Sequence, residues 1–288
     1  MSKNHLMIID GMALLFRAYY ATAINNYFMI NSKGIPTNAI YGFVKHFLTA
    51  KETFNPSHII VCWDLEGGSY RSEIYPEYKA NRSEAPSELI PQFSLVKDVV
   101  SSFDVPNIGV KGYEADDCIG TIVKELSSDN NITVVTGDKD LLQLVNNRTS
   151  VAILKNGIGN YNIFTKEKFI ETYGILPSQF SEVKAFMGDA SDNYSGVKGI
   201  GEKTALKLIK EFQSVQGVLG NLANVSKSIK TKIENDLDSL LISLKLAEIN
   251  CEVPLKIDLE HLKVQINKNK AYKMLEELEF KGLDKIIS

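Results

Sequence analysis

The sequence has few cysteines and few histidines, and this excludes several kinds of site. Its three cysteines, Cys62, Cys118 and Cys251, are dispersed and lack the paired spacing of a zinc site or a disulfide framework. We expect them to be buried small hydrophobic side chains. The four histidines lie beside no candidate nucleophile, so neither a Ser-His-Asp nor a Cys-His arrangement is indicated.

Long hydrophobic runs are also missing from the 288 residues. The longest apolar stretches are a handful of residues, far short of the roughly 20 that a helix needs to cross a bilayer. The first five residues lead directly into a strand pattern rather than a signal peptide. We therefore expect a cytoplasmic protein without membrane association.

Three short strand patterns each end in an aspartate, and helical patterns separate them. The strands are expected over 6–10, 58–64 and 131–138, and a fourth over 150–155 lacks the acid. Helices are expected over 12–20, 39–54, 88–103 and 115–126. This alternation predicts an α/β fold with a mostly parallel, doubly wound sheet.

The three strand-end aspartates are Asp10, Asp64 and Asp138. One aspartate after a strand is ordinary turn chemistry. Turn chemistry does not require an aspartate at the end of all three strands. The carboxyl ends of parallel strands meet at one edge of the sheet, where binding sites form, so these three side chains would lie close together. The pattern favours a metal site at that edge, to which Asp140 is a further candidate contributor.

A stretch at the start of the helical pattern 115–126 carries three acids, Glu114, Asp116 and Asp117. A helix dipole alone could explain acids at this end. In a helix, however, Glu114 and Asp117 share a face while Asp116 points about 100° away, which could serve two adjacent cations. A second pair of acids at i, i+3, Asp189 and Asp192, comes much later in the chain.

The segment 66–91 is too long for an ordinary connection between a strand and a helix. It interleaves aromatic and basic side chains, among them Arg71, Tyr78, Lys79 and Arg82. A solvated loop is the simpler reading. Stacked bases and phosphates nevertheless suit this composition, so we interpret it as a partly helical, substrate-binding excursion.

After about residue 173 the strand patterns stop, which predicts a catalytic domain over 1–173 and a helical region over 174–288. A glycine-rich turn opening a helix lies within 188–210, and Lys198, Lys203 and Lys207 supply positive charge. The spacing fits neither a Walker A loop nor a dinucleotide fingerprint. It resembles the hairpins that hold a nucleic-acid duplex by its backbone, without reading bases.

Seven ordered motifs together resemble the 5'-3' exonuclease domain of bacterial DNA polymerase I and its relatives, the flap endonucleases. They are Ile9-Asp10-Gly11, Trp63-Asp64, Glu77-Tyr-Lys79-Ala-Asn-Arg82, Gly112-Tyr-Glu114-Ala-Asp116-Asp117, Thr136-Gly-Asp138-Lys-Asp140, Gly188-Asp189-Ala-Ser-Asp192-Asn193 and Gly196-Val-Lys-Gly-Ile-Gly201-Glu-Lys-Thr-Ala205. The resemblance covers nearly the whole chain and implies a PIN-like or resolvase-like sheet, a helical arch over about 66–91 and a C-terminal helix-hairpin-helix (helix-three-turn-helix) motif. It also implies a stand-alone enzyme without polymerase domains.

The resemblance implies two clusters of metal-binding acids. The first matches Asp10, Asp64, Glu114 and Asp116, and the second matches Asp117, Asp138, Asp140, Asp189 and Asp192. All-carboxylate ligation favours two Mg²⁺ or Mn²⁺ ions. With nine of the 35 acids committed to this two-metal site, the other 26 face 32 lysines and arginines, so a chain of net charge −3 can still present a basic face.

The expected reaction is phosphodiester hydrolysis by a two-metal mechanism, with Asp10, Asp116, Lys79 and Arg82 as catalytic residues. Lys79 and Arg82 match arch residues that contact the scissile phosphate. The expected partner is duplex or flapped DNA, bound without sequence specificity by a monomer, and a K⁺ ion at the hairpin is a further candidate cofactor. The expected DNA-binding residues are Arg71, Tyr78, Lys79, Arg82, Gly196, Lys198, Gly199, Gly201, Lys203 and Thr204.

One departure and three alternatives remain. Ser195 stands where the family usually has proline before the hairpin glycine, which puts duplex affinity in question. A PIN-type ribonuclease shares the acid-bearing sheet but generally lacks the glycine hairpin. A non-catalytic binder of branched DNA would not need the complete acid set, and a haloacid-dehalogenase-type phosphatase would need a second aspartate where Met12 stands.

Overall fold

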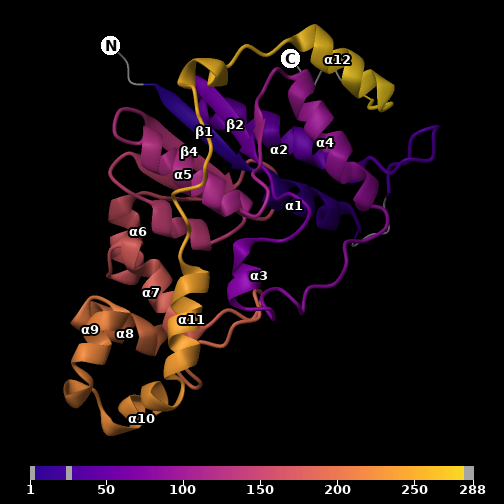
Figure 1. The fold of residues 1–288 in the computed structure, drawn as a ribbon. Coiled ribbons are helices and arrows are strands. Elements are labelled where there is room, and N and C mark those ends of the chain that lie inside the picture. Colours follow the sequence, from indigo (N-terminus) through magenta and orange to yellow (C-terminus); the bar gives the residue numbers. More distant parts are fainter. Residues whose placement is uncertain (1–3, 24–27, 282–288) are drawn as a thin grey trace.

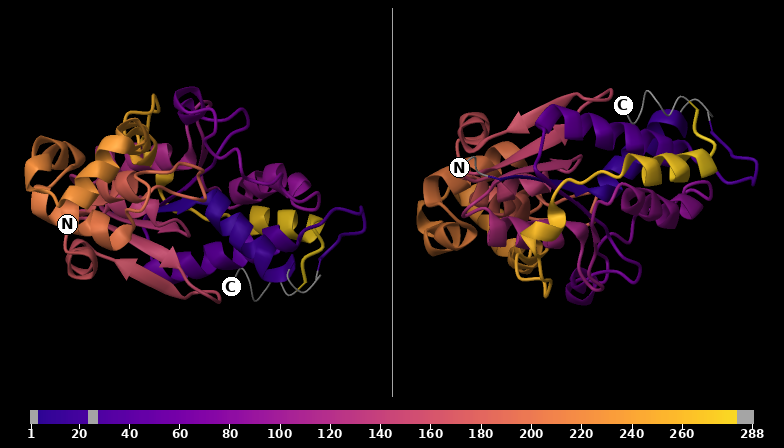
Figure 2. Two further views of the ribbon diagram at one scale, coloured as in Figure 1. Left: turned by 90° about the horizontal axis from the view of Figure 1, so that it is seen from below. Right: turned by 90° about the horizontal axis from the view of Figure 1, so that it is seen from above.

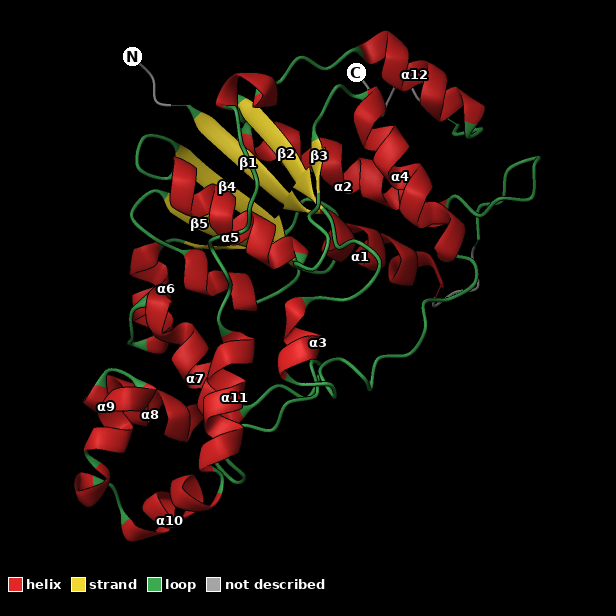
Figure 3. Cartoon of the chain, in the orientation of Figure 1, coloured by secondary structure: helices red, strands yellow, loops and turns green. Residues whose placement is uncertain are grey.

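A six-stranded sheet forms the centre of the computed structural model, which describes residues 4–23 and 28–281 (Figures 1 and 3). The strand order is β3-β2-β1-β4-β5-β6, and β6 alone runs antiparallel to its neighbour. The strands are β1 His5–Asp10, β2 His58–Cys62, β3 Asn107–Ile108, β4 Asn131–Thr136, β5 Thr149–Leu154 and β6 Tyr161–Phe164. The predicted doubly wound α/β architecture is confirmed.

The central strand β1 is buried on both faces because successive side chains point to opposite sides of the sheet. Leu6 and Ile8 pack into one hydrophobic core, and Met7 and Ile9 pack into the other. All four are fully buried. Each such side chain contributes about 1.5–3 kcal/mol when it leaves water. The register of β1 is therefore fixed, and with it the position of the aspartate that ends the strand.

Helices cover both faces of the sheet, as the views along its edge in Figure 2 show. One face packs against α1 Gly11–Ala23, α2 Asn38–Phe54, α4 Ile90–Ser102 and α12 Lys268–Glu277. The opposite face packs against α5 Ala115–Leu126 and the nearer part of the C-terminal helices. The expected helices agree with these to within a few residues, and the start and end of α5 are as expected.

The segment 66–91 contains one short helix, α3 Tyr70–Ile74, which confirms the prediction that it is partly helical. A 3₁₀ helix, η1 Asp140–Leu144, follows β4. Two edge strands, β3 and β6, were not predicted. β3 has only two residues, and β6 follows β5 through a hairpin rather than a helix, so neither shows the alternation on which the prediction rested.

The chain beyond residue 174 is helical where the structure describes it, as expected. Besides α12, its elements are α7 Phe180–Met187, α8 Glu202–Phe212, α9 Val215–Gly220, α10 Lys227–Asn235 and α11 Leu237–Ala247, with 3₁₀ turns η2 Pro177–Gln179, η3 Leu222–Asn224 and η4 Leu259–Leu262. The preceding helix is α6 Lys166–Tyr173. Within the described residues, no helix is both long and apolar enough to span a membrane.

After α11 the chain turns back towards the sheet (Figure 1). It runs past α5, forms an isolated bridge between Lys263 and His58, and ends with α12 packed against α4. The chain thus passes twice between the sheet domain and the outer helices, once on the way out and once on the return after α11. This return path brings residues 246–250 against α3 and α5.

Candidate functional site

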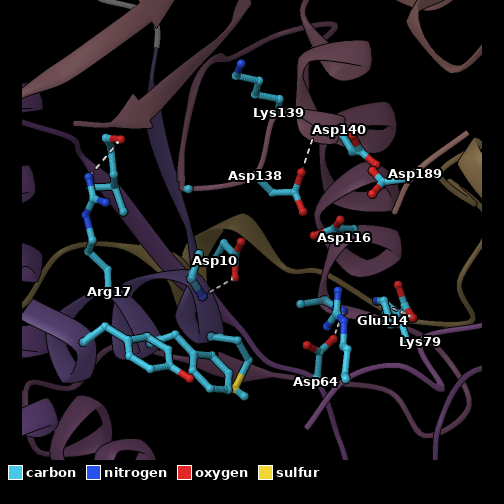
Figure 4. Close-up of a pocket in the computed structure, with 18 of the residues that line it drawn as sticks. Asp10, Arg17, Asp64, Lys79, Glu114, Asp116, Asp138, Lys139, Asp140 and Asp189 are labelled. Carbon is cyan, nitrogen blue, oxygen red and sulfur yellow. Dashed lines mark hydrogen bonds and ion pairs between the residues drawn. The ribbon is translucent and has the colours of Figure 1, made fainter. Parts of the chain in front are cut away.

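A cavity of about 670 Å³ opens at the carboxyl ends of the strands, and seven acids line it (Figure 4). They are Asp10, Asp64, Glu114, Asp116, Asp138, Asp140 and Asp189. The topology explains the gathering: β1, β2 and β4 are parallel neighbours, so the residues that follow them reach the same edge. Glu114 and Asp116 come from the start of α5, Asp140 from the 3₁₀ helix that follows β4, and Asp189 from the loop after α7.

Backbone and hydroxyl donors hold the strand-end carboxylates in place. Asp10 accepts hydrogen bonds from Thr136 Oγ1 at 2.7 Å and from the Ala13 backbone N–H at 3.0 Å. Asp64 Oδ1 accepts from the Ala115 backbone N–H at 2.7 Å, which links the end of β2 to the start of α5. The acids are therefore positioned by the sheet and its helices rather than by a flexible loop.

Burial and mutual repulsion raise the pKa of several of these carboxyls. Burial is the main cause for Asp10, and with Asp64 and Asp138 nearby it raises the pKa of Asp10 to about 7. The same causes raise the pKa of Asp116 well above its ordinary value. Burial also raises the pKa of Asp64, and it raises that of Asp140, beside Asp138, to about 6. So many anions in one cavity require protons or cations for balance.

This charge balance predicts how stability depends on pH. A carboxyl whose pKa is raised in the folded state stabilises the fold below its unfolded pKa, and the contribution is lost as pH rises through the folded pKa. Without divalent cations, the temperature at the midpoint of thermal unfolding should decrease as the pH is raised from about 4 to about 7. These limits are the ordinary and the raised pKa of Asp10. Thermal unfolding in EDTA at stepped pH measures it.

The matched variants for this prediction are Asp10→Asn, which should flatten the slope, and Asp98→Asn on the exposed face of α4, which should not. Adding Mn²⁺ at pH 8 should restore much of the lost stability. An unfolding temperature that rises steadily from pH 4 to pH 7 in EDTA would contradict the assignment of a raised pKa to Asp10.

The donor set fits a hard divalent cation, because every acid side chain that lines the cavity offers carboxylate oxygen. As placed, however, no three acidic, histidine or cysteine side chains among the described residues converge closely enough to hold a metal ion. Lysines partly balance the charge instead. Lys79 Nζ lies 2.8 Å from Glu114 Oε1, and Lys184 Nζ lies 2.8 Å from Asp140 Oδ1 and also contacts Asp189.

The segment that follows α3 is docked on the loop after α7. Arg82 Nη2 lies 2.7 Å from Asp192 Oδ1, and the Tyr78 hydroxyl donates to Asp192 Oδ2 at 2.9 Å and to Glu114 Oε2 at 3.2 Å. The Lys79 backbone N–H donates to the Asp192 carbonyl. Lys79 and Arg82 themselves line the cavity. Asp192, predicted as a metal ligand, is therefore a partner of this segment and does not line the cavity.

The predicted roles of Asp117 and Arg71 need correction. Asp117 is fully buried, and Arg71 binds both of its oxygens, at 2.8 and 2.9 Å. Backbone N–H groups of Asn250 and Glu114 complete its hydrogen bonds. An acid three residues into a helix reaches back to its first turn, which turns Asp117 away from the cavity. Asp117 is thus a structural anion rather than a metal ligand.

Arg71 is only 2% exposed and also donates to the carbonyls of Leu246 and Glu248, so it joins α3, α5 and the end of α11 instead of contacting DNA. Tyr78 is 6% exposed, so its ring is not free to stack on a base. Sequence position showed that both residues belong to the long excursion. It did not show that this part of the excursion packs against the body of the protein.

The glycine-rich hairpin lies away from the sheet, between α7 and α8 (Figure 1). Gly196 has φ +60°, and a Cβ there would lie 2.4 Å from the backbone nitrogen of Gly188, so glycine is required. Gly199 also has positive φ. The Ser243 hydroxyl accepts from the Gly196 N–H and the Ser239 hydroxyl donates to the Gly196 carbonyl. The turn after Ser195 is therefore fixed by α11 without the usual proline.

The hairpin presents an open, basic surface. Lys198, Lys203 and Lys207 are exposed, Gly201 caps α8, and Thr204 lies in its first turn. The Lys198 backbone N–H and the Gly199 carbonyl are bound within the helical region by Asp236 and Lys232. The charged side chains consequently remain available to an external anion.

Sequence reasoning missed Lys184 and Thr136, which both contact the cavity acids. Thr136 is the last residue of β4 and faces Asp10 across neighbouring strands, a pairing that depends on sheet order. Lys184 is the one basic residue on α7, whose neighbouring residues Val183, Ala185 and Phe186 are buried. A lone lysine on a mainly apolar helix, five residues before an acid, was the only available signal.

Comparisons with protein families cover most of the chain. A family described as 5'-3' exonuclease, N-terminal resolvase-like domain, matches residues 5–174, and one described as 5'-3' exonuclease, C-terminal SAM fold, matches residues 175–270. The chain is 50% identical over 287 residues to a 5'-3' exonuclease of Bacillus subtilis, covering 100% of this chain and 97% of that protein.

More distant relatives extend the comparison. The chain is 36% identical over 284 residues to DNA polymerase I of Bacillus subtilis, covering 98% of this chain but 32% of the polymerase. The T5 D15 protein co-crystallised with metal ions superimposes with a TM-score of 0.70 at 24% identity, covering 99% of this chain and 100% of that one. The catalytic core of Rad2 in complex with DNA substrate gives 0.62 at 14% identity, over 99% and 91%. These structures share the fold.

Proposed function

This chain belongs to the 5'-3' exonuclease family and is a nuclease, and from that premise we propose that it is a metal-dependent 5'-3' exonuclease and 5'-flap endonuclease that hydrolyses DNA phosphodiester bonds in replication or repair. The observation that carries the proposal is the cavity in which seven acids from distant parts of the chain meet Lys79 and Arg82. The seven carboxylates can bind divalent cations, and the two cationic side chains can bind a phosphate group.

The acids would hold two divalent ions, Mg²⁺ or Mn²⁺. Asp10, Asp64, Glu114 and Asp116 are the candidates for the first, and Asp138, Asp140 and Asp189 for the second. When bound, such ions supply a water of lowered pKa and positive charge beside the attacking and leaving oxygens. Neutralisation of the cavity would bring the Asp10 carboxyl, whose pKa is about 7, into its ionised form.

Lys79 and Arg82 would bind the scissile phosphate and stabilise the charge that develops on it. Both side chains reach the cavity from one side, where they are now paired with Glu114 and Asp192. A bound phosphodiester could take over either partner, since ammonium and guanidinium groups donate equally to phosphate and carboxylate oxygens. Water is then displaced from the cavity, which strengthens these contacts.

The hairpin would grip duplex DNA by its backbone, away from the cavity. Lys198→Ala and Lys203→Ala should each weaken binding of a duplex with a 5' flap and lower the slope of log affinity against log salt by about 1. Fluorescence anisotropy in EDTA from 50 to 300 mM salt measures this. Lys245→Ala on α11 serves as the control. Unchanged slopes in both hairpin variants would contradict the assignment.

Several expectations remain proposals for this chain. We propose a catalytic domain over 1–173 and a DNA-binding helical region over 174–288. Residues 1–3 and 24–27 of the first and residues 282–288 of the second lie outside the described part of the chain. We also propose a cytoplasmic monomer and a K⁺ ion at the hairpin. The hairpin carbonyls that such an ion would require are partly bound internally, as at Gly199.

A panel of labelled substrates tests the proposed function. It contains a 5'-flap DNA, the same structure in RNA, a single strand and a duplex with a blocked 5' end, each with Mg²⁺ and with Mn²⁺. We expect cleavage near the flap junction of the DNA and release of short products from free 5' ends. Preference for the RNA would identify a ribonuclease, and tight binding of the flap without cleavage would identify a non-catalytic binder.

A further inference from the structure

Lys184 lies between two of the acids that line the cavity. It belongs to α7, and its Nζ is 2.8 Å from Asp140 Oδ1 and in contact with Asp189 Oδ2. Only 12% of its side chain is exposed. The two acids come from positions almost fifty residues apart, and this one ammonium group joins them. It therefore stands where a divalent ion shared by Asp140 and Asp189 would stand.

The charges around Lys184 are matched by direct contacts. Its ammonium group pairs with the carboxylates of both Asp140 and Asp189. Asp189 Oδ1 also accepts hydrogen bonds from the Ser191 backbone N–H at 2.7 Å and from the Ser191 hydroxyl at 2.5 Å. The three groups thus form a compensated cluster of two anions and one cation.

The Asp10–Asp116 side of the cavity is compensated only at its rim, where Lys79 pairs with Glu114. Among the described residues, Asp10, Asp64 and Asp116 form no ion pair with a lysine or arginine. A divalent ion entering between Asp10 and Asp116 displaces no cation that is paired with either acid, whereas one entering between Asp140 and Asp189 must displace the ammonium group of Lys184.

We propose that Lys184 is a resident cation that holds the second-ion position in the metal-free enzyme and so imposes an order in which the Asp10–Asp116 side fills first and the Asp140–Asp189 side fills second and weakly. The inference rests on the proposed function, because it assumes that the cavity binds two ions. It assigns to Lys184 the control of metal affinity at the Asp140–Asp189 side of the cavity.

Titration of the whole, DNA-free protein with Mn²⁺ tests the inference, using calorimetry with electron paramagnetic resonance to count free ions. The wild type should show one tighter and one weaker ion. In Lys184→Met, which keeps most of the side-chain length without the charge, the weaker ion should bind at least tenfold more tightly while the tighter one changes by less than threefold. Lys184→Arg, which keeps the charge, should resemble the wild type.

Lys139→Met is the matched control. Lys139 also lines the cavity, but it is exposed, extends away from the carboxylates in Figure 4 and has no ion pair within the described part of the chain. Its loss removes the same charge from the same cavity, so we expect both affinities within about threefold of the wild type. Equal tightening in the Lys139 and Lys184 variants would overturn the inference, since general charge would then explain the effect.

Stability provides a second measurement, because removing Lys184 leaves two carboxylates without their partner. Lys184→Met should unfold at lower temperature than the wild type in EDTA, and Mn²⁺ should raise its midpoint by more than it raises that of the wild type. If this variant does not fold in EDTA, Lys184→Gln provides the same comparison. A smaller Mn²⁺-induced rise in these variants would overturn the inference.

The remaining outcomes separate the inference from the proposed function. Two ions in the wild type with unchanged or weakened second-ion binding in folded Lys184→Met would overturn the inference alone. A wild type that binds no Mn²⁺ would overturn the proposed function and the inference together. Simultaneous binding of two equal ions to the wild type would overturn the proposed order.

Discussion

Asp116→Ala is expected to lower the rate of cleavage by about 10³-fold or more, because an acid that holds an ion contributes several kcal/mol to the barrier. Asp116 is buried in the cavity among other acids. Burial raises its pKa, and so do the nearby carboxylates of Asp138, Asp10, Asp64 and Glu114. Single-turnover cleavage of a 5'-flap substrate at saturating Mg²⁺ measures the chemical step directly.

Binding of DNA should survive this change, because removing an anion does not weaken attraction to a polyanion and the hairpin lysines are untouched. We expect the affinity of Asp116→Ala for the flap substrate in EDTA to lie within about threefold of the wild type. Asp98→Ala, an exposed acid on α4, controls for the loss of one charge. Metal-dependent turnover of Asp116→Ala at the wild-type rate would remove the acid cavity from the mechanism.

Lys79→Met is expected to lower kcat by about 10²- to 10³-fold with a much smaller effect on KM, as for the loss of one group that stabilises transition-state charge. Lys79 reaches the cavity and is held there by Glu114 at 2.8 Å. Burial would lower its pKa, but Glu114 and Asp192 raise it, so the side chain is cationic at neutral pH. Steady-state kinetics on the flap substrate separates the two constants.

The matched control for Lys79 is Lys111→Met, an exposed lysine just before the acids of α5. We expect it to retain wild-type kcat. If Lys79→Met raises KM and leaves kcat intact, Lys79 binds the substrate and its transition state equally. That result would move Lys79 from catalysis to substrate binding.

The strand-end acids could be predicted from sequence because three buried strands are readable as apolar runs. Once β1, β2 and β4 are parallel, the positions of Asp10, Asp64 and Asp138 follow from the direction of the chain. The start of α5 was equally visible, since its apolar face repeats with helical period. Local patterns therefore located most of the acids that line the cavity.

Side-chain partners depend on long-range packing, and there prediction failed. Asp117 sits among three acids in sequence, but Arg71, 46 positions away, binds it in the interior. A buried carboxylate with an arginine and backbone donors is satisfied without a metal, and breaking one such pair costs about 3–5 kcal/mol. Lys184 was missed for the same reason, because its two acids meet it only in the folded chain.

The edge of the sheet was also beyond local patterns. β6 pairs with β5 through a hairpin, and of its four residues only Phe164 is buried, so it lacks the apolar run that marked the central strands. Exposed edge strands take their structure from the neighbour to which they bond. Predicting β6 would have required knowing that β5 had a free edge.

Cleavage with and without divalent ions tests most directly the claim that the acid cavity is a metal-dependent catalytic centre. The enzyme is freed of metal, mixed with a 5'-flap DNA in EDTA and then supplied with Mg²⁺ at pH values from 6 to 8. We predict no detectable cleavage in EDTA and full recovery on adding Mg²⁺, with apparent Mg²⁺ affinity rising with pH through about 7, where Asp10 ionises. Undiminished cleavage in EDTA would contradict the claim.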